Sequence, residues 1–301
     1  MYKYTIVLSL TMVLWTCSLP SFAREGQTQQ TVNQQIRLAT QGFKSDVGVA
    51  YLLDNHLYTY NDTIHYPLMS VFKLHVAVAA LQRMETEGTL LLDTRQIDSI
   101  QMRHNTYSPL LDRYPSGGFR ISYADLLYYA LALSDNNACD ILIDYAGGIE
   151  AVKACTDRVG LTGYDLTETE ASMHEDTSAC YHNWAHPSSV AHLLKKIHDG
   201  SLLNAEHTRF ICSTLIETST GSNKIRAGLP AGITIGHKTG SSGRINGLTI
   251  ADNDAACIYL PDGRRCYLVI FVKDSHESDS KNAALIARIT HIIYNTITQT
   301  H

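Results

Sequence analysis

The stretch Pro67-Leu68-Met69-Ser70-Val71-Phe72-Lys73 carries an apolar segment into the expected first turn of a helix. Residues three apart share a helix face, so the Ser70 hydroxyl and the Lys73 amine become neighbours. A serine beside an amine is a nucleophile beside a possible base. A helix start also offers free backbone N–H groups and a positive dipole end, which suit an anion forming on an attacked carbonyl. The stretch predicts either such a nucleophilic site or an ordinary helix start.

The spacing Ser-x-x-Lys is a weak signal by itself, because Ser278-Asp279-Ser280-Lys281 has it too. Two further motifs strengthen it. Ser134-Asp135-Asn136 comes at an expected helix start, and Lys238-Thr239-Gly240-Ser241 ends an expected strand. Each alone is typical of a helix cap or a strand end. All three in this order are the set found in the penicillin-recognising serine enzymes.

With these motifs the sequence resembles the class A β-lactamases over nearly the whole chain after residue 23. The resemblance implies hydrolysis of the β-lactam ring of penicillins and cephalosporins through a serine acyl-enzyme, which gives antibiotic resistance. Ser70 would attack the lactam carbonyl, and Lys73 would shuttle its proton. Ser134 would then give a proton to the leaving nitrogen.

Substrate contacts are expected around the serine. Asn136 can bond an amide side chain of the substrate. The cation of Lys238 and the hydroxyl of Thr239 suit the carboxylate that these drugs carry. The resemblance implies an oxyanion hole made by the backbone N–H groups of Ser70 and Ser241.

Glu170 separates a hydrolase from an enzyme that stalls after acylation. Penicillin-binding proteins share the three motifs, so hydrolysis needs a second base for the water. The resemblance implies a glutamate on the long polar loop at 162–186, and Glu170 lies at the matching place. Glu168 and Glu175 are nearby, and a solvated acidic loop is the alternative. Whether the lysine or this glutamate is the base for acylation stays open.

The sequence departs from the commoner family pattern beside this glutamate and near the third motif. Ala171 stands where a proline usually follows the glutamate, and His174 stands where an asparagine usually helps to hold the water. An imidazole can also bond a water. Gly247 lies near the position of a carboxylate-binding arginine in many members. Lys224, one strand before the third motif, or else Arg226, could supply that charge.

Other positions refine the resemblance. Tyr107 matches an aromatic residue at the mouth of the family's site. Ala77 and Leu127 stand where some relatives have a disulfide, so that bridge is absent. The altered loop and Ser241-Ser242 resemble the extended-spectrum, cephalosporin-hydrolysing branch, which predicts a cephalosporin bias.

The composition fits a globular enzyme. The 301 residues are 45% hydrophobic and 18% charged, which is enough for one large domain or two intertwined ones. The net charge is -5, and no run of Lys and Arg could follow a phosphate backbone. The histidines form no H-x-H-x-D pattern, which is the arrangement of ligands expected in a metallo-β-lactamase. We therefore expect a monomer that takes a small-molecule β-lactam, without nucleic acid, metal or cofactor.

The N-terminus is typical of a secretory signal peptide at 1–23. Lys3 precedes an apolar run at 4–15, and Ser21-Phe22-Ala23 puts small residues at the outer positions of a cleavage site. We expect a periplasmic protein that is free of the membrane after processing. A membrane anchor is the alternative, but the run is shorter than the ~20 residues that span a bilayer. A lipoprotein at Cys17 is a further alternative, disfavoured by the bulky Trp15.

Six of the seven cysteines follow the expected cleavage site: Cys139, Cys155, Cys180, Cys212, Cys257 and Cys266. Export permits disulfides, but six cysteines allow about 15 pairings, so the pairing stays open. Small buried residues are the favoured interpretation for most. If Asp262-Gly263 is a two-residue turn, Cys266 faces Tyr259, and Cys257 is only its diagonal neighbour. That distance argues against a bridge between them.

The pattern of segments predicts an α/β sandwich, an antiparallel sheet flanked by helices with an inserted helical domain. A helix at 31–43 and a hairpin of strands at 46–53 and 56–60 come first, and 90–215 is mostly helical. Gly88 is expected to end the helix after Ser70. Later elements are expected at 233–238, 245–250, 255–260 and 267–272 as strands, and at 278–296 as a helix. We expect an α/β domain from 24–66 and 217–301 and a helical domain at 67–216.

Two rival functions remain at this point. A D-Ala-D-Ala peptidase or penicillin-binding sensor of the same fold would acylate but turn over slowly. A periplasmic binding protein without activity could also have kept the fold. The presence of all three motifs together with Glu170 favours the hydrolase.

Overall fold

The computed structural model describes residues 21–299, and its central feature is a five-stranded sheet with the order β2-β1-β10-β9-β8. Every neighbouring pair is antiparallel, which confirms the fold class predicted from the sequence. The strands are β1 (Asp46–Leu53), β2 (His56–Tyr60), β8 (Thr234–Ser241), β9 (Thr249–Tyr259) and β10 (Arg265–Ser275).

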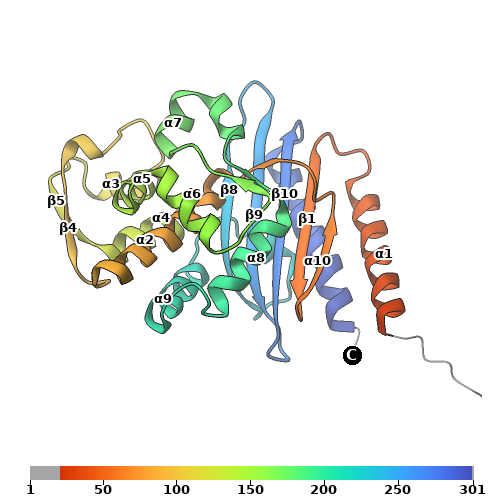
Figure 1. The fold of residues 1–301 in the computed structure, drawn as a ribbon. Coiled ribbons are helices and arrows are strands. Elements are labelled where there is room, and N and C mark those ends of the chain that lie inside the picture. The colour runs from red at the N-terminus through yellow and green to blue at the C-terminus, as the bar shows by residue number, and fades with distance from the viewer. Residues whose placement is uncertain (1–20, 300–301) are drawn as a thin grey trace, which may run out of the picture.

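The sheet is covered on both faces, so its inner strands are apolar on both sides (Figure 1). Along β10, Leu268 and Ile270 belong to one core, while Val269 and Phe271 belong to the other. Helices α1 (Ser21–Thr40) and α10 (Asp279–Gln299) cover the first face, and α8 (Pro187–His198) packs on the second against β1 and β10. Alternating side chains of a strand point to opposite faces, which explains why the sequence shows a continuous apolar run here.

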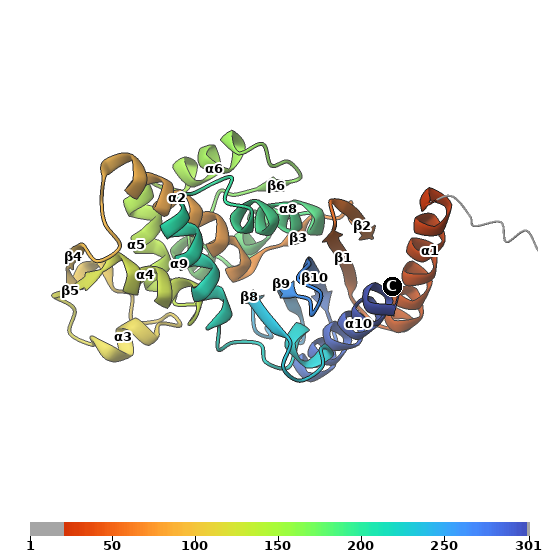
Figure 2. The same ribbon diagram turned by 90° about the horizontal axis from the view of Figure 1, so that it is seen from below.

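The remaining helices lie to one side of the sheet, beyond β8 (Figure 2). Helix α2 (Lys73–Glu87) packs against several of them and is almost entirely buried over its first half. Gly88 ends it in the left-handed conformation, with a φ of 72°, as the sequence predicted. The other helices on this side are α3 (Pro109–Arg113), α4 (Tyr123–Leu131), α5 (Asn136–Ala146), α6 (Ile149–Arg158) and α9 (Ala205–Ile216), of which α4, α5 and α6 contact α2.

The segment at 162–186, expected to be an aperiodic loop, contains short regular elements. They are β6 (Tyr164–Asp165), α7 (Glu170–Glu175), the 3₁₀ turn η3 (Thr177–Tyr181) and β7 (Trp184–Ala185). Strands β6 and β7 join β3 (Tyr66–Pro67) in a small sheet, and β4 (Thr94–Ile97) pairs with β5 (Phe119–Ser122) in another. These strands are too short to leave a periodic pattern in the sequence.

The expectation of two strands at 245–250 and 255–260 is wrong, because β9 is one continuous strand. Asp252, Asn253 and Asp254 interrupt the apolar pattern in its middle, yet all three are buried. Asn253 Nδ2 donates to the carbonyls of Pro67 at 2.7 Å and Leu68 at 3.2 Å. Its Oδ1 accepts from the N–H of Val272. The polar break in the sequence is therefore an anchor that joins the sheet to the segment before Ser70.

The expected two-residue turn after β9 is also wrong. Leu260 bonds to Arg264 around a three-residue loop in which Gly263 has a φ of 87°. The register therefore shifts by one, and Cys266 lies opposite Ile258 while Cys257 lies opposite Tyr267. The two cysteines face opposite cores, so no bridge joins them. All six described cysteines are free, and all except Cys212 are buried.

The expected signal peptide lies outside the described residues except for its last three positions, which open α1. Between residues 21 and 299, no helix is both long enough and apolar enough to cross a membrane.

Asn253→Ala should lower the free energy of unfolding by about 3 kcal/mol, because the buried backbone groups of Pro67, Leu68 and Val272 each lose a hydrogen bond. Chemical denaturation of parent and variant measures this difference. Asn295→Ala, whose side-chain contact with His291 is exposed, is the matched control and should change stability by less than about 0.5 kcal/mol. A loss below about 1 kcal/mol for Asn253→Ala would show that this residue is not the anchor.

Candidate active site

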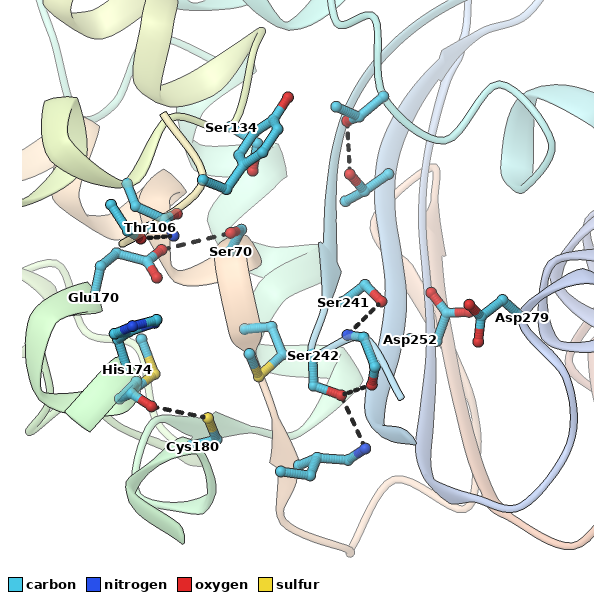
Figure 3. Close-up of a pocket in the computed structure, with 18 of the residues that line it drawn as sticks. Ser70, Thr106, Ser134, Glu170, His174, Cys180, Ser241, Ser242, Asp252 and Asp279 are labelled. Atoms are coloured by element: carbon cyan, nitrogen blue, oxygen red, sulfur yellow. Dashed lines mark hydrogen bonds between the residues drawn. The ribbon is translucent and has the colours of Figure 1, made fainter. Parts of the chain in front are cut away.

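Ser70 lies in a short 3₁₀ turn, η1 (Met69–Phe72), which leads directly into α2. The residue before it, Met69, has a φ of 46°, and Ser134 has a φ of 60°. Such left-handed backbone is uncommon for residues other than glycine and persists only where the surrounding structure enforces it. The Ser70 hydroxyl points at the Glu170 carboxylate, with 3.5 Å between Oγ and Oε1 (Figure 3).

Lys73 is fully buried and makes three short polar contacts. Its Nζ donates to the Ser134 carbonyl and to Asn136 Oδ1, each at 2.7 Å. The Glu170 Oε1 atom lies 2.9 Å from the same nitrogen. An ammonium group has three protons, and these acceptors take all of them. The amine therefore links two motifs to the loop glutamate.

Lys238 is also fully buried, on β8, and faces Ser134 from the opposite side. Its Nζ donates to Ser134 Oγ at 2.8 Å and to the Thr239 carbonyl at 2.9 Å. Burial, together with the charge of Lys73 nearby, holds the pKa of Lys238 well below its usual range. The Ser134 hydroxyl oxygen accepts a hydrogen bond from Lys238, so the O–H of Ser134 stays free to donate.

Asp140 on α5 holds the backbone of Glu170. Its two carboxylate oxygens accept from the N–H groups of Glu170 and Ala171, each at 2.9 Å. These N–H groups open α7, where a carboxylate is favoured by the helix dipole. Burial, with the charge of Glu170, raises the pKa of Asp140 to about 6. Asp140 was not predicted from the sequence, where its only signal is a position one turn after Asn136 on the same helix face.

Asn183 closes the loop at its other end and was missed as well. It is fully buried, and its Oδ1 accepts from the N–H groups of Thr167 at 2.8 Å and Glu168 at 2.9 Å. Its own carbonyl accepts from the N–H of Leu68, two residues before the serine. The side chain of Glu168 turns away and contacts His182 at 2.9 Å. The loop thus presents Glu170, rather than Glu168, to Ser70.

The end of β8 passes very close to the serine segment at Gly240. A Cβ on Gly240 would lie 2.5 Å from the Leu68 carbonyl oxygen, nearer than atoms can approach. The missing side chain lets the end of β8 approach the backbone of Ser70, whose N would lie 3.1 Å from such a Cβ. The Thr239 hydroxyl lies 2.7 Å from that of Thr220.

Many of the predicted residues line one cavity of about 870 Å³ (Figure 3), whereas Lys73, Lys238 and Gly240 are not among its lining residues. Tyr107 stands at its rim and is 59% exposed. Asn136 Nδ2 donates to Thr106 Oγ1, which fixes the orientation of the amide. The predicted residues that line the cavity are Ser70, Tyr107, Ser134, Asn136, Glu170, His174, Lys224, Thr239 and Ser241.

The structure corrects the placement of the auxiliary cation. Lys224 lies in the connection between α9 and β8, not one strand before Lys238, and its Nζ pairs with Asp252 Oδ1 at 2.5 Å. Arg226 donates to the Ile233 carbonyl and does not line this cavity. Gly247 lies in the connection between β8 and β9 and therefore does not face Ser241 across the sheet. The β9 residue opposite Ser241 is Asp252.

The second Ser-x-x-Lys match is an ordinary helix start. Ser278 precedes α10, and Lys281 forms an ion pair with Glu277 at 2.8 Å.

Comparison with known proteins agrees with this geometry. Residues 28–297 match a family described as the β-lactamase enzyme family. A β-lactamase from Bacteroides uniformis is 42% identical over 94% of this chain and 96% of its own length. The extended-spectrum β-lactamase PER-1 from Pseudomonas aeruginosa is 34% identical, over 92% of this chain and 90% of its own.

Solved structures give the same result. A class A β-lactamase from Bacteroides cellulosilyticus superimposes with a TM-score of 0.88 at 40% identity, covering 90% of this chain and 99% of that one. The TLA-1 extended-spectrum β-lactamase also gives 0.88, at 32% identity and the same coverage. Sequence and structure thus agree over nearly the full described length, and this chain belongs to the β-lactamase enzyme family as a class A serine enzyme.

Proposed function

We propose that Ser70, Lys73, Ser134 and Glu170 carry out the hydrolysis of the β-lactam ring in this enzyme. The observation that carries the proposal is the position of the Glu170 carboxylate, 3.5 Å from Ser70 Oγ and 2.9 Å from Lys73 Nζ. A nucleophile and a carboxylate base are thereby in contact, and a buried cation holds the base in place.

Acylation begins with attack of Ser70 Oγ on the lactam carbonyl carbon. The three acceptors around Lys73 leave no lone pair directed at Ser70, which supports Glu170 as the group that receives the hydroxyl proton. The N–H groups of Ser70 and Ser241 would stabilise the oxyanion. When the C–N bond breaks, the nitrogen takes the Ser134 proton, and Lys238 can replace it.

Deacylation uses the same carboxylate, after the proton that Glu170 took from Ser70 has returned through water to Lys238 and has left the carboxylate ionised again. Glu170 removes a proton from water, the hydroxide attacks the ester carbon, and Ser70 leaves with a proton returned to its oxygen. His174 lines the cavity on the next turn of α7, where its imidazole could bond that water. A carboxylate in this position favours a hydrolase over a slowly deacylating penicillin-binding protein.

The substrate is proposed to lie with its carboxylate at Lys238, Thr239 and Lys224. Its acyl amide would face Asn136, with Tyr107 at the rim of the cavity. PER-1 and TLA-1 are described as extended-spectrum enzymes, which supports a cephalosporin bias for this chain.

We propose that the enzyme is exported to the periplasm after removal of 1–23, acts there as a monomer and gives antibiotic resistance. We also propose that the cavity lies between an α/β unit, 24–66 and 217–301, and a helical unit, 67–216, which includes the catalytic loop at 162–186.

Glu170→Gln should keep the shape of the loop and lose the base for deacylation. Mixed with a cephalosporin, this variant should accumulate an adduct on Ser70, visible as a lasting increase in intact mass. Ser70→Ala should form no adduct, and Glu168→Gln is the matched control that should turn over like the parent. If Glu168→Gln stalls and Glu170→Gln does not, the catalytic carboxylate has been assigned to the wrong residue.

Lys224→Ala should reduce kcat/KM about tenfold or more, because a charge-assisted hydrogen bond contributes about 1.5–3 kcal/mol. Steady-state kinetics with a penicillin and a cephalosporin measure the loss. A change within about twofold would remove Lys224 from the carboxylate site.

We propose that Asp140 positions Glu170, and its pKa makes stability depend on pH. The pKa is about 6 in the folded chain and about 3.9 in an unfolded one. Because folding raises it, this group's contribution to stability is fully present below about pH 4 and is lost as pH rises through 6. Asp140→Asn lacks this contribution.

The free energy of unfolding of the parent, minus that of Asp140→Asn, should therefore grow by on the order of 2 kcal/mol as pH falls from about 7 to about 4. Denaturation of both proteins across this range measures it. A difference that stays constant with pH would contradict the raised pKa.

A further inference from the structure

The same cavity continues past Ser241 to Asp252 and Asp279 (Figure 3). Lys224 also lines this end, and the three residues form a charged wall. Asp252 is the direct cross-strand partner of Ser241, and neighbours of this kind have Cβ atoms about 4.5–5.5 Å apart. Asp279 opens α10, and Ala283, one turn later, lines the same cavity. The wall is therefore part of the site that holds Ser70 rather than a separate pocket.

The charges of this wall do not cancel. The Lys224 ammonium and the Asp252 carboxylate are both buried and form a pair at 2.5 Å, so together they add no net charge, while the third proton of the ammonium stays available to the substrate. Asp279 lines the cavity and forms no ion pair with any cation of residues 21–299. The nearest lysine on its own helix, Lys281, is paired with Glu277 instead. One negative charge is left over at this end of the cavity.

The proposed function places the substrate carboxylate at Lys238, Thr239 and Lys224, beside this wall. In a cephalosporin, the ring carbon that bears the carboxylate is bonded to C3, which carries the second variable substituent. A group attached at C3 must therefore lie close to the carboxylate subsite. A positive charge on that group would lie near Asp279, whereas a negative or neutral group would gain nothing there.

We propose that Asp279, backed by the neutral pair of Lys224 and Asp252, is a specificity-determining residue that favours cephalosporins with a cationic C3 substituent. This inference rests on the proposed function, because that function orients the substrate. Asp279 is exposed, so the preference is modest and is screened by salt. It acts by attraction in the bound substrate and does not change the acyl-transfer chemistry.

Cephaloridine and cephalothin provide a matched pair of probes. They share the same thienylacetamido group, and they differ at C3, where cephaloridine carries a pyridinium and cephalothin a neutral acetoxy group. Values of kcat/KM for both drugs would be measured at low ionic strength for the parent, Asp279→Asn, Asp279→Glu and Glu277→Gln. Glu277 is the control, because its removal changes the net charge equally near α10 without lining the catalytic cavity.

The ratio of kcat/KM for cephaloridine to that for cephalothin should fall about three- to fivefold in Asp279→Asn, mainly through KM. Asp279→Glu should keep the parental ratio, Glu277→Gln should leave it unchanged, and high salt should shrink the effect. A ratio within about 1.5-fold of the parent in Asp279→Asn, or an equal fall in Glu277→Gln, would overturn the inference. Failure of the parent to acylate either drug would instead overturn the proposed function.

Discussion

The site depends on the contacts between the buried amine of Lys73 and its three acceptors. The amine joins three segments far apart in the sequence: its own helix α2, residues Ser134 and Asn136 at the start of α5, and Glu170 on the loop at 162–186. A buried charge is costly unless it is fully paired, so the native structure requires all three segments in place. The same contacts that compensate the charge also bring the proposed base within 3.5 Å of the nucleophile. The contacts that stabilise the buried charge are therefore the same contacts that assemble the site.

A second constraint joins this network to the sheet. Asn253 in the middle of β9 bonds the carbonyls of Pro67 and Leu68, and Gly240 at the end of β8 lets the strand approach the same segment. Asn183 ties the loop at 162–186 to the same segment through Leu68. Ser70 therefore lies where sheet, loop and helix α2 all converge. The left-handed backbone at Met69 is held by these surrounding contacts.

The sequence predicted the elements that have a local signal. The order of three short motifs indicated the family, and the hairpin of β1 and β2 and the end of α2 at Gly88 followed from turn and cap residues. Prediction failed where a buried polar group serves a distant partner. Asp252, Asn253 and Asp254 look like a break in a strand because their partners lie far along the chain.

The residues that support the loop at 162–186 were not predicted, for the same reason. Asp140 and Asn183 act on backbone N–H groups of the loop, and backbone partners leave no pattern in a single sequence.

The proposed mechanism depends above all on a covalent intermediate that forms on Ser70 and is then hydrolysed. Intact mass of the parent enzyme, quenched at successive times after mixing with a cephalosporin, tests this most directly. We expect an adduct that maps to Ser70 and disappears as the drug is consumed; loss of drug with no adduct at any time, or an adduct that never clears, would contradict the account.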